Sequence, residues 1–99
     1  MKLQILDAAK NDLIEGFHFY EEQQQGLGDY SLVNLYADIE SLKVFRGFHQ
    51  KVYKDLQRAL SKKFPYAIYY SIDEDIVKVR AIIDYRRSSY WIEKHLKND

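Results

Sequence analysis

The chain of 99 residues is long enough for one domain with a modest hydrophobic core, and we expect residues 1–99 to fold as a single unit. Its hydrophobic content of 46%, its charged content of 30% and its formal net charge of zero are those of an ordinary folded, soluble protein. The absence of cysteine excludes disulfides and thiolate sites, and no signal-like start or apolar run of roughly 18 residues occurs, which predicts a cytoplasmic protein without a membrane partner.

The first segment predicts a short strand followed by a helix. The apolar run LQIL at 3–6 fits a strand, and Asp7 is a candidate N-cap for the helix that follows. This helix is expected to run to about Gln25. Gly16 inside it costs roughly 1 kcal/mol relative to alanine, so we expect a close backbone approach there. The apolar stripe of the helix comprises Ala9, Leu13, Ile14, Phe17 and Tyr20.

The motif GLGD at 26–29 predicts a break in the chain and the start of a second helix. Gly26 or Gly28 can adopt the left-handed conformation that ends a helix, and Asp29 can cap the next one. Gly47 is expected to end this second helix. Because the link is short, the two helices should form an antiparallel hairpin. The second apolar stripe comprises Leu32, Leu35, Tyr36, Ile39 and Leu42.

Residues 51–63 are compatible with two kinds of secondary structure. Val52, Leu56 and Leu60 recur at every fourth position, which is typical of a helix. The same three residues also fit one face of a strand, with basic residues between them. The periodicity by itself favours the helix.

The segment from Pro65 onward predicts a β-hairpin, since the proline discourages a helix across the preceding residue. DED at 73–75 predicts the turn. On the first strand, one face is expected to carry Tyr66, Ile68, Tyr70 and Ile72, and the other Ala67, Tyr69 and Ser71. On the return strand, the expected apolar face comprises Val77, Val79, Ala81 and Ile83.

The last predicted element is a short helix that begins at Ser88 or Ser89. Its inner side is expected to comprise Trp91, Ile92, His95 and Leu96. The whole order predicts an α+β fold. An N-terminal strand is followed by an antiparallel helical hairpin packed on a mostly antiparallel sheet, and a short C-terminal helix ends the chain.

The net charge of zero conceals an uneven distribution. Residues 1–42 carry two lysines and eight acids and sum to −6, whereas residues 43–99 carry 13 bases and seven acids and sum to +6. Between Lys43 and Lys63, seven bases accompany one acid, Asp55. A basic half favours an anionic partner, either an acidic protein or nucleic acid, although it can also be a solvated face that balances the acidic half.

The chain has no strong motif for a metal, a cofactor or an activated nucleophile, and we expect no cofactor. His18, His49 and His95 lie far apart and lack the spacing of metal ligands. One catalytic option remains, metal-free RNA cleavage, which needs a base, cations on the phosphate and an acid. The groups available for it are Lys51, Lys54, Arg58, Arg80, Tyr85, Arg86, Arg87 and Tyr90. The alternative is that these residues form the solvated side of the sheet.

Three segments in order carry a family pattern: AAKNDLIEGFHFYEEQQQGLGDY at 8–30, RALSKKFPYAIYYSIDEDIVKVRAIID at 58–84, and RR with a following tryptophan at 86–91. Together they resemble the RelE/ParE superfamily of bacterial type II toxins, most closely the ParE-type, or plasmid-stabilisation, proteins. The likeness covers almost the whole chain as a single toxin domain. It implies that 51–61 is a strand, against the periodicity.

The resemblance also implies a function. Members of the superfamily poison growth and are neutralised by a cognate antitoxin; RelE-like members cut mRNA on the ribosome, and ParE-like members act on DNA gyrase. RelE-type cleavage uses an arginine early in the strand that here reads YAIYY, at the position of Ala67. A phosphate site that lacks one cation loses a charge-assisted contact, so the ParE-like branch, acting by binding rather than as an enzyme, is favoured.

The expected partners are therefore a cognate antitoxin and DNA gyrase, with direct nucleic-acid binding only in the RelE-like case. The candidate partner-binding residues are Lys54, Arg58, Arg80, Tyr85, Arg86, Arg87, Tyr90 and Trp91. Arginine, tyrosine and tryptophan are the residue types enriched in interface hot spots. If the chain is a nuclease, the expected catalytic residues are Lys51, Lys54, Arg58, Arg86 and Tyr90.

The sequence departs from the family pattern in two places. Ser31 follows GLGDY where the family has an aromatic residue, and Ser88-Ser89 follow the two arginines where it has Asp or Asn before proline. Such changes could alter the partner surface or weaken toxicity. A third hypothesis is therefore a non-toxic relative that binds an antitoxin.

Overall fold

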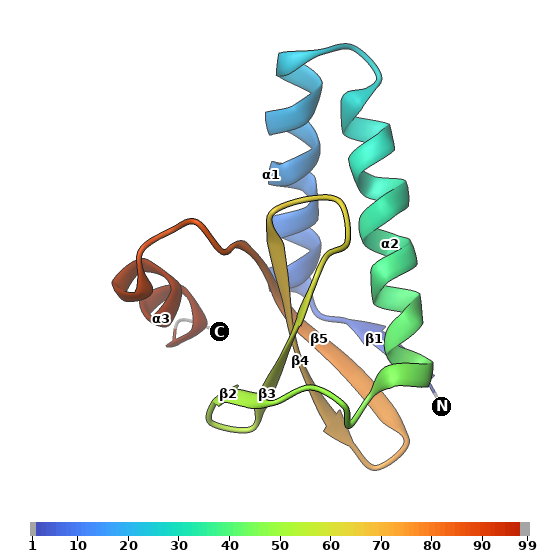
Figure 1. The fold of residues 1–99 in the computed structure, drawn as a ribbon, viewed down its shortest axis with the longest axis vertical. Coiled ribbons are helices and arrows are strands. Elements are labelled where there is room, and N and C mark those ends of the chain that lie inside the picture. Colours follow the sequence, from blue (N-terminus) through green and yellow to red (C-terminus); the bar gives the residue numbers. More distant parts are fainter. Residues whose placement is uncertain (1, 98–99) are drawn as a thin grey trace.

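The computed structural model describes residues 2–97, which form five strands and three helices (Figure 1). In chain order these are β1 (Lys2–Ile5), α1 (Asp7–Gln23), α2 (Leu27–Phe45), β2 (Lys51–Tyr53), β3 (Leu56–Leu60), β4 (Tyr66–Asp73), β5 (Ile76–Asp84) and α3 (Ser89–Lys97). Among the described helices, none has the length and apolar character needed to cross a bilayer.

The five strands form one sheet in the order β1-β5-β4-β3-β2. β1 pairs with β5 in parallel, and the other three pairs are antiparallel. The two central strands, β4 and β5, are the longest and contain the most deeply buried residues of the sheet. The mostly antiparallel sheet predicted from the sequence is confirmed.

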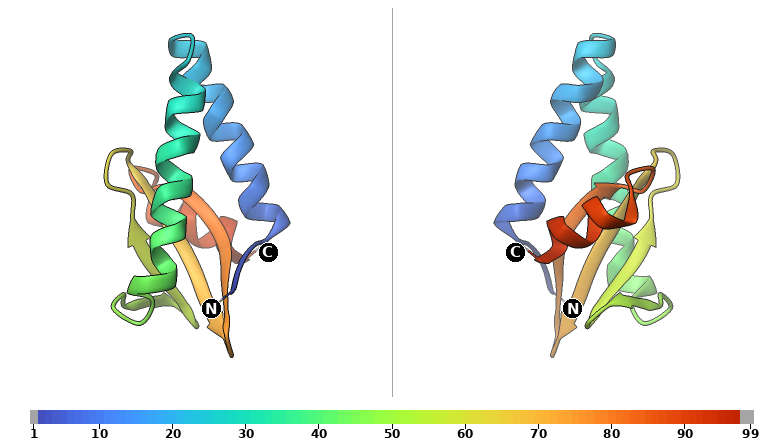
Figure 2. Two further views of the ribbon diagram at one scale, coloured as in Figure 1. Left: turned by 90° about the vertical axis from the view of Figure 1, so that its right-hand side faces the viewer. Right: turned by 90° about the vertical axis from the view of Figure 1, so that its left-hand side faces the viewer.

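The helices α1 and α2 form an antiparallel hairpin that covers one face of the sheet and extends past one of its ends (Figures 1 and 2). The core between hairpin and sheet contains Ala9, Leu13, Tyr20, Leu35, Ile39, Leu42, Ala59, Tyr66, Ile68, Tyr70, Val77, Val79 and Ile82. Both predicted apolar stripes contribute to this core. Ile14 and Tyr36, however, are 54% and 45% exposed on the outer side of the hairpin.

The short helix α3 lies on the opposite face of the sheet, as the two views of Figure 2 show. A second, smaller core underneath it contains Leu56, Ala67, Tyr69, Ala81, Ile83 and Leu96, with Tyr53, Trp91 and Ile92 at its margin. The predicted inner side of the terminal helix is confirmed in this packing. With helices on both faces, β4 is buried on both sides, which explains why its sequence is apolar almost without interruption.

The helix that the periodicity favours at 51–63 is wrong, and the single strand that the family resemblance implies at 51–61 is present as two short strands. The segment forms β2 and β3, joined by a tight turn at which Lys54 adopts a positive φ of 51°. Val52 and Leu60 are 41% and 59% exposed, whereas Leu56 is buried, so the three residues do not share one buried face. Pairing with β4 therefore prevails over a weak helical spacing.

The predicted apolar face of β5 is also wrong, because the strand contains a bulge. Tyr69 is opposite Ala81 and Tyr70 is opposite Val79, which leaves Arg80 as an extra residue. An extra residue reverses the alternation of side chains beyond it. Val77 and Val79 consequently face the hairpin, whereas Ala81 and Ile83 face α3.

Neither predicted aspartate forms an N-cap. Leu6 precedes α1 in the capping position without a side-chain hydrogen bond, and Asp7 is the first residue of the helix. α2 begins after Gly26, which adopts the predicted left-handed conformation with φ of 89°. The carboxylate of Glu21 accepts hydrogen bonds from the amides of Gly26 and Gly28, so α1 satisfies the N-terminal amides of α2.

The loop between α2 and β2 is fixed to the sheet by a polar contact in the core. The Tyr70 hydroxyl donates to Oε1 of Gln57 at 3.0 Å and makes a second hydrogen bond with Nδ1 of His49. Gly47, which ends α2 as predicted, allows the turn with φ of 90°. His49 thus has a structural partner.

We expect Gly28→Ala to destabilise the hairpin. A methyl group at this position would lie 2.8 Å from the ring of Phe17 and from its backbone carbonyl oxygen, so α1 and α2 would have to separate. Urea unfolding should show a loss of about 1–3 kcal/mol in the free energy of unfolding. Asn34→Ala, on the exposed side of α2, should change it by less than about 0.5 kcal/mol. Equal effects of the two substitutions would contradict this packing.

Candidate functional site

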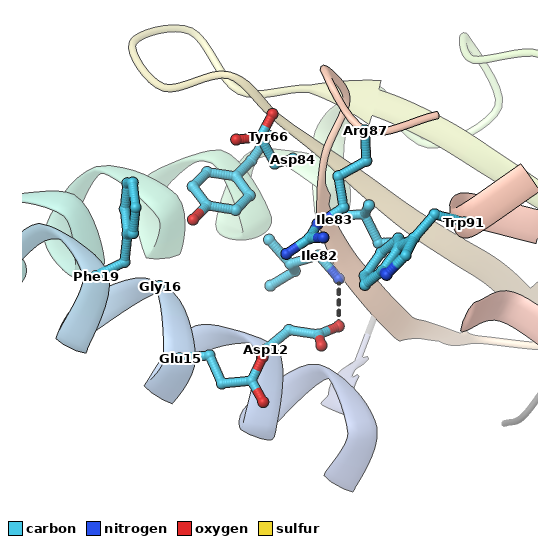
Figure 3. Close-up of a pocket in the computed structure, with 10 residues that line it drawn as sticks. All are labelled: Asp12, Glu15, Gly16, Phe19, Tyr66, Ile82, Ile83, Asp84, Arg87 and Trp91. Atoms are coloured by element: carbon cyan, nitrogen blue, oxygen red, sulfur yellow. Dashed lines mark hydrogen bonds between the residues drawn. The ribbon is translucent and has the colours of Figure 1, made fainter. Parts of the chain in front are cut away.

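A cleft of about 250 Å³ lies between α1, the end of β5 and the segment that leads into α3 (Figure 3). Its lining residues are Asp12, Glu15, Gly16, Phe19, Tyr66, Ile82, Ile83, Asp84, Arg87 and Trp91. The cleft contains two of the residues predicted to bind a partner, Arg87 and Trp91, at one wall. The opposite wall belongs to α1, which the sequence did not link to any site.

Asp12 connects three elements at the base of the cleft. Its Oδ2 accepts a hydrogen bond of 2.9 Å from the backbone amide of Ile82, and its Oδ1 accepts one of 3.2 Å from Nε2 of His95 on α3. Its side chain is only 8% exposed. Burial raises the pKa of the Asp12 carboxyl above its ordinary value, although the Ile82 amide and His95 act in the opposite direction.

Arg87, Trp91 and His95 form a stack along the α3 side of the cleft. The guanidinium carbon of Arg87 lies 3.9 Å from the centre of the Trp91 ring. The rings of Trp91 and His95 are nearly parallel, with centroids 4.8 Å apart. Such stacking holds the arginine head against an aromatic surface with its N–H groups free to donate. Trp91 is thus partly core and partly cleft wall.

Tyr66 forms the end of the cleft near α1. Its side chain emerges at the start of β4 and its hydroxyl points toward Gly16 (Figure 3). A Cβ at Gly16 would lie 3.2 Å from that hydroxyl oxygen, so the close approach expected at this glycine is confirmed. Burial raises the pKa of Tyr66 to about 12, and the residue is therefore a neutral phenol at physiological pH.

The neighbouring arginines, Arg86 and Arg87, have different surroundings. Arg86 makes three side-chain hydrogen bonds to the carboxylate of Asp84, the shortest of 2.6 Å. These bonds hold the pKa of the Asp84 carboxyl below its ordinary value and raise that of Arg86. The guanidinium of Arg87 forms no ion pair or hydrogen bond within residues 2–97, so it is the arginine free to bind another molecule.

Ser88, the first of the two serines that depart from the family pattern at 88–89, has a clear local role. The Ser88 hydroxyl accepts a hydrogen bond of 3.1 Å from the amide of Trp91, and the Ser88 carbonyl accepts one from Ile92. Ser88 therefore caps α3 and helps to orient Trp91. On either side, Tyr85 and Tyr90 are 46% and 74% exposed.

Ser31, the other departure, lies in the interior. It is fully buried between the helices, and its hydroxyl donates a hydrogen bond of 2.7 Å to the carbonyl of Gly28. A change at Ser31 therefore cannot alter a partner surface directly, which corrects that expectation. It affects the packing of the hairpin instead.

The remaining predicted site residues lie at other places on the surface. Arg58 lines a groove of about 190 Å³ between β3 and α3. Lys54 and Arg80 line a small depression of about 70 Å³ with Asp55 and Lys97. Lys51 is exposed on β2, an edge strand of the sheet.

The candidate nuclease residues are thus spread over several elements. Arg86 lies in the segment between β5 and α3, whereas Lys54 lies in the turn between β2 and β3. Tyr90 stands on the outer side of α3, with Nζ of Lys94 5.8 Å from its ring centre. Within residues 2–97, no three His, Cys, Asp or Glu side chains are grouped so that they could hold a metal ion.

Sequence reasoning missed Asp12 and Tyr66 as cleft residues. A signal for Asp12 was present, since Asp12, Gly16 and Tyr20 recur at four-residue spacing and lie on the face of α1 that packs on the sheet. An acid on such a face must find a buried partner. Tyr66 gave no such signal, because its sequence position is equally typical of a core tyrosine.

Comparison with known proteins finds a likeness in structure and none in sequence. No protein-family pattern and no curated protein matches the chain. A chain of the structure described as "Chromosomal ParDE TA system from P. aeruginosa" aligns with a TM-score of 0.78 at 10% identity, over 85% of this chain and 95% of that one. The two chains share a fold. The predicted resemblance to ParE-type proteins is confirmed at the level of the fold.

Asp12→Ala should destabilise the protein more than Asp12→Asn. Alanine leaves the buried amide of Ile82 without an acceptor, which costs about 1–3 kcal/mol, whereas asparagine retains an acceptor oxygen. Urea unfolding followed by circular dichroism should give less than half of this loss for the asparagine variant. Equal losses would show that the Ile82 hydrogen bond contributes nothing.

The difference in the free energy of unfolding between wild type and Asp12→Asn should also depend on pH. A carboxyl whose folded-state pKa is raised destabilises the folded protein when it is ionised, and this penalty disappears as the pH falls through the folded and then the unfolded pKa. Relative to the asparagine variant, wild type should therefore gain stability as the pH is lowered from about 7 to about 4. A relative loss over this range would mean that the pairs with His95 and Ile82 outweigh burial.

Proposed function

We propose that the chain is the toxin component of a type II toxin–antitoxin module, held neutral in the cytoplasm by a cognate antitoxin, and that it acts on DNA gyrase by binding. The observation that carries the proposal is the fold shared with a chain of a chromosomal ParDE system, at a TM-score of 0.78 over 85% of this chain.

Binding to an acidic antitoxin is supported by the chemistry around α3. Tyr85, Arg87 and Tyr90 are exposed beside the half-buried Trp91, and these residue types supply interface hot spots. Arg58 borders the groove between β3 and α3, on the same side of the sheet. Disordered acidic segments that fold on binding commonly add a helix to such a groove or a strand to a sheet edge.

Action by binding rather than by RNA cleavage is supported by two features. Ala67, at the position of the arginine used in RelE-type cleavage, is completely buried beneath α3. Arg86, one of the expected catalytic residues, is paired with Asp84. A nuclease transition state needs preorganised cations that converge on one phosphate, and two of the proposed cations, Lys54 and Arg58, line different depressions.

The decisive experiment is induction of the chain without antitoxin in growing bacteria, with pulse labelling of DNA and protein. We expect DNA synthesis to fall first, because gyrase inhibition blocks replication before it affects translation. The control is the same plasmid with the reading frame closed after Lys2, at matched induction. Expression is verified by immunoblotting.

The other two outcomes identify the alternatives. If protein synthesis falls first and mRNA fragments accumulate, the chain is a RelE-like ribosome-dependent nuclease, and the residues to test are Lys51, Lys54, Arg58, Arg86 and Tyr90. If neither falls at verified expression, the chain is a non-toxic relative that retains the fold and its antitoxin-binding surface.

A further inference from the structure

The polar groups of the cleft beside α1 differ in whether they already have partners. Both oxygens of Asp12 accept hydrogen bonds, from Ile82 and His95. Both oxygens of Asp84 accept hydrogen bonds from Arg86. Two of the three carboxylates that line the cleft are therefore satisfied from within the chain, and they do not require a ligand.

Two donors in the same cleft have no acceptor among the described residues. The guanidinium of Arg87 is stacked on Trp91 and reaches into the space between Trp91 and Tyr66 (Figure 3). Tyr66 is only 8% exposed, and its hydroxyl makes no hydrogen bond within residues 2–97. Arg87 is exposed, and no fully buried side-chain nitrogen or oxygen among residues 2–97 lacks a partner, so both donors are open at the cleft. An acceptor group of another molecule can therefore reach them.

Both donors carry their protons at physiological pH. Arginine remains charged, and the pKa of Tyr66, raised to about 12 by burial, keeps its hydroxyl protonated. A guanidinium and a phenol together present several N–H and O–H donors and one positive charge. This is the complement of a single carboxylate, which accepts a forked hydrogen bond from arginine.

We propose that this cleft receives one carboxylate, an aspartate or glutamate side chain of a protein partner, between the Arg87 guanidinium and the Tyr66 hydroxyl. The proposal rests on the proposed function in so far as that partner is the antitoxin. Phe19, Ile82 and the face of Trp91 offer apolar walls for the methylene groups of the incoming side chain. A volume of about 250 Å³ holds such a side chain with space for its backbone at the mouth.

The acids of the cleft select a carboxylate over a phosphate. Asp12, Glu15 and Asp84 lie around the same space, and their basic partners are Arg86 on Asp84 and His95 on Asp12. Coulomb repulsion grows with the charge of the ligand, so a phosphate dianion meets about twice the repulsion of a carboxylate. A site for nucleic acid would instead surround the phosphate with cations.

The position of Trp91 makes a direct test possible, because it is the only tryptophan of the chain and lies in the cleft wall. The full chain is titrated with N-acetylglutamate amide, N-acetylglutamine amide and inorganic phosphate. Binding is followed by Trp91 fluorescence and by the NMR signal of its indole N–H. We expect the glutamate probe to bind at least about tenfold more tightly than the glutamine probe, and phosphate to bind more weakly than the glutamate probe.

Two substitutions at the site and one matched control complete the test. Arg87→Gln should abolish the preference for the glutamate probe, and Tyr66→Phe should weaken its binding by about fivefold or more. Lys94→Gln removes the same charge from the outer side of α3 and should leave the affinity unchanged within about twofold. Circular dichroism and thermal unfolding check that each variant is folded.

Three results would overturn the proposal: equal binding of the glutamate and glutamine probes, tighter binding of phosphate than of the glutamate probe, or no response of Trp91 up to the solubility limit of the probes. Because the titration uses neither antitoxin nor cells, its failure leaves the result of the growth experiment standing. Conversely, a chain that proves non-toxic can still bind the carboxylate.

Discussion

The carboxylate of Asp12 connects three parts of the fold that are far apart in the sequence. β1 is paired with β5 only as far as Val79, so the outer edge of β5 lacks a strand neighbour beyond that residue. Asp12 supplies the missing acceptor to Ile82 at this edge, and the same side chain receives His95 from α3. An unpaired buried amide is costly. The helical hairpin, the end of the sheet and the terminal helix are therefore held at one point, and the cleft lies beside it.

The bulge at Arg80 has an equally wide effect on the structure. It divides β5 into one part that faces the hairpin and another part that faces α3. A protein of this size thus has two small cores on the two faces of one sheet. Without the extra residue, Ile83 would turn away from α3, and the terminal helix would lose apolar surface on which to pack.

The candidate site depends on the difference between two adjacent arginines. Arg86 is neutralised by Asp84 two residues before it, whereas Arg87 is stacked on Trp91 and directed into the cleft. The same two residues in a solvated loop would be interchangeable. Here the cap at Ser88 starts α3 at a fixed position and thereby places Trp91 under the second arginine. In the proposed function, partner binding by this surface therefore centres on Arg87, whereas Arg86 is paired with Asp84.

The sequence alone determined the class and order of the elements, because strong local signals mark them. These signals are the helical stripes before and after Gly26, the alternation from Tyr66 to Ile72, and the serines before α3. Local periodicity misassigned 51–63, since pairing with β4 is a contact between distant segments that no local spacing reports. The bulge, the partners of Asp12 and the free hydroxyl of Tyr66 were decided only by tertiary structure. Each depends on contacts between segments that are distant in the sequence. Whether a polar group finds a hydrogen-bond partner is decided by those contacts.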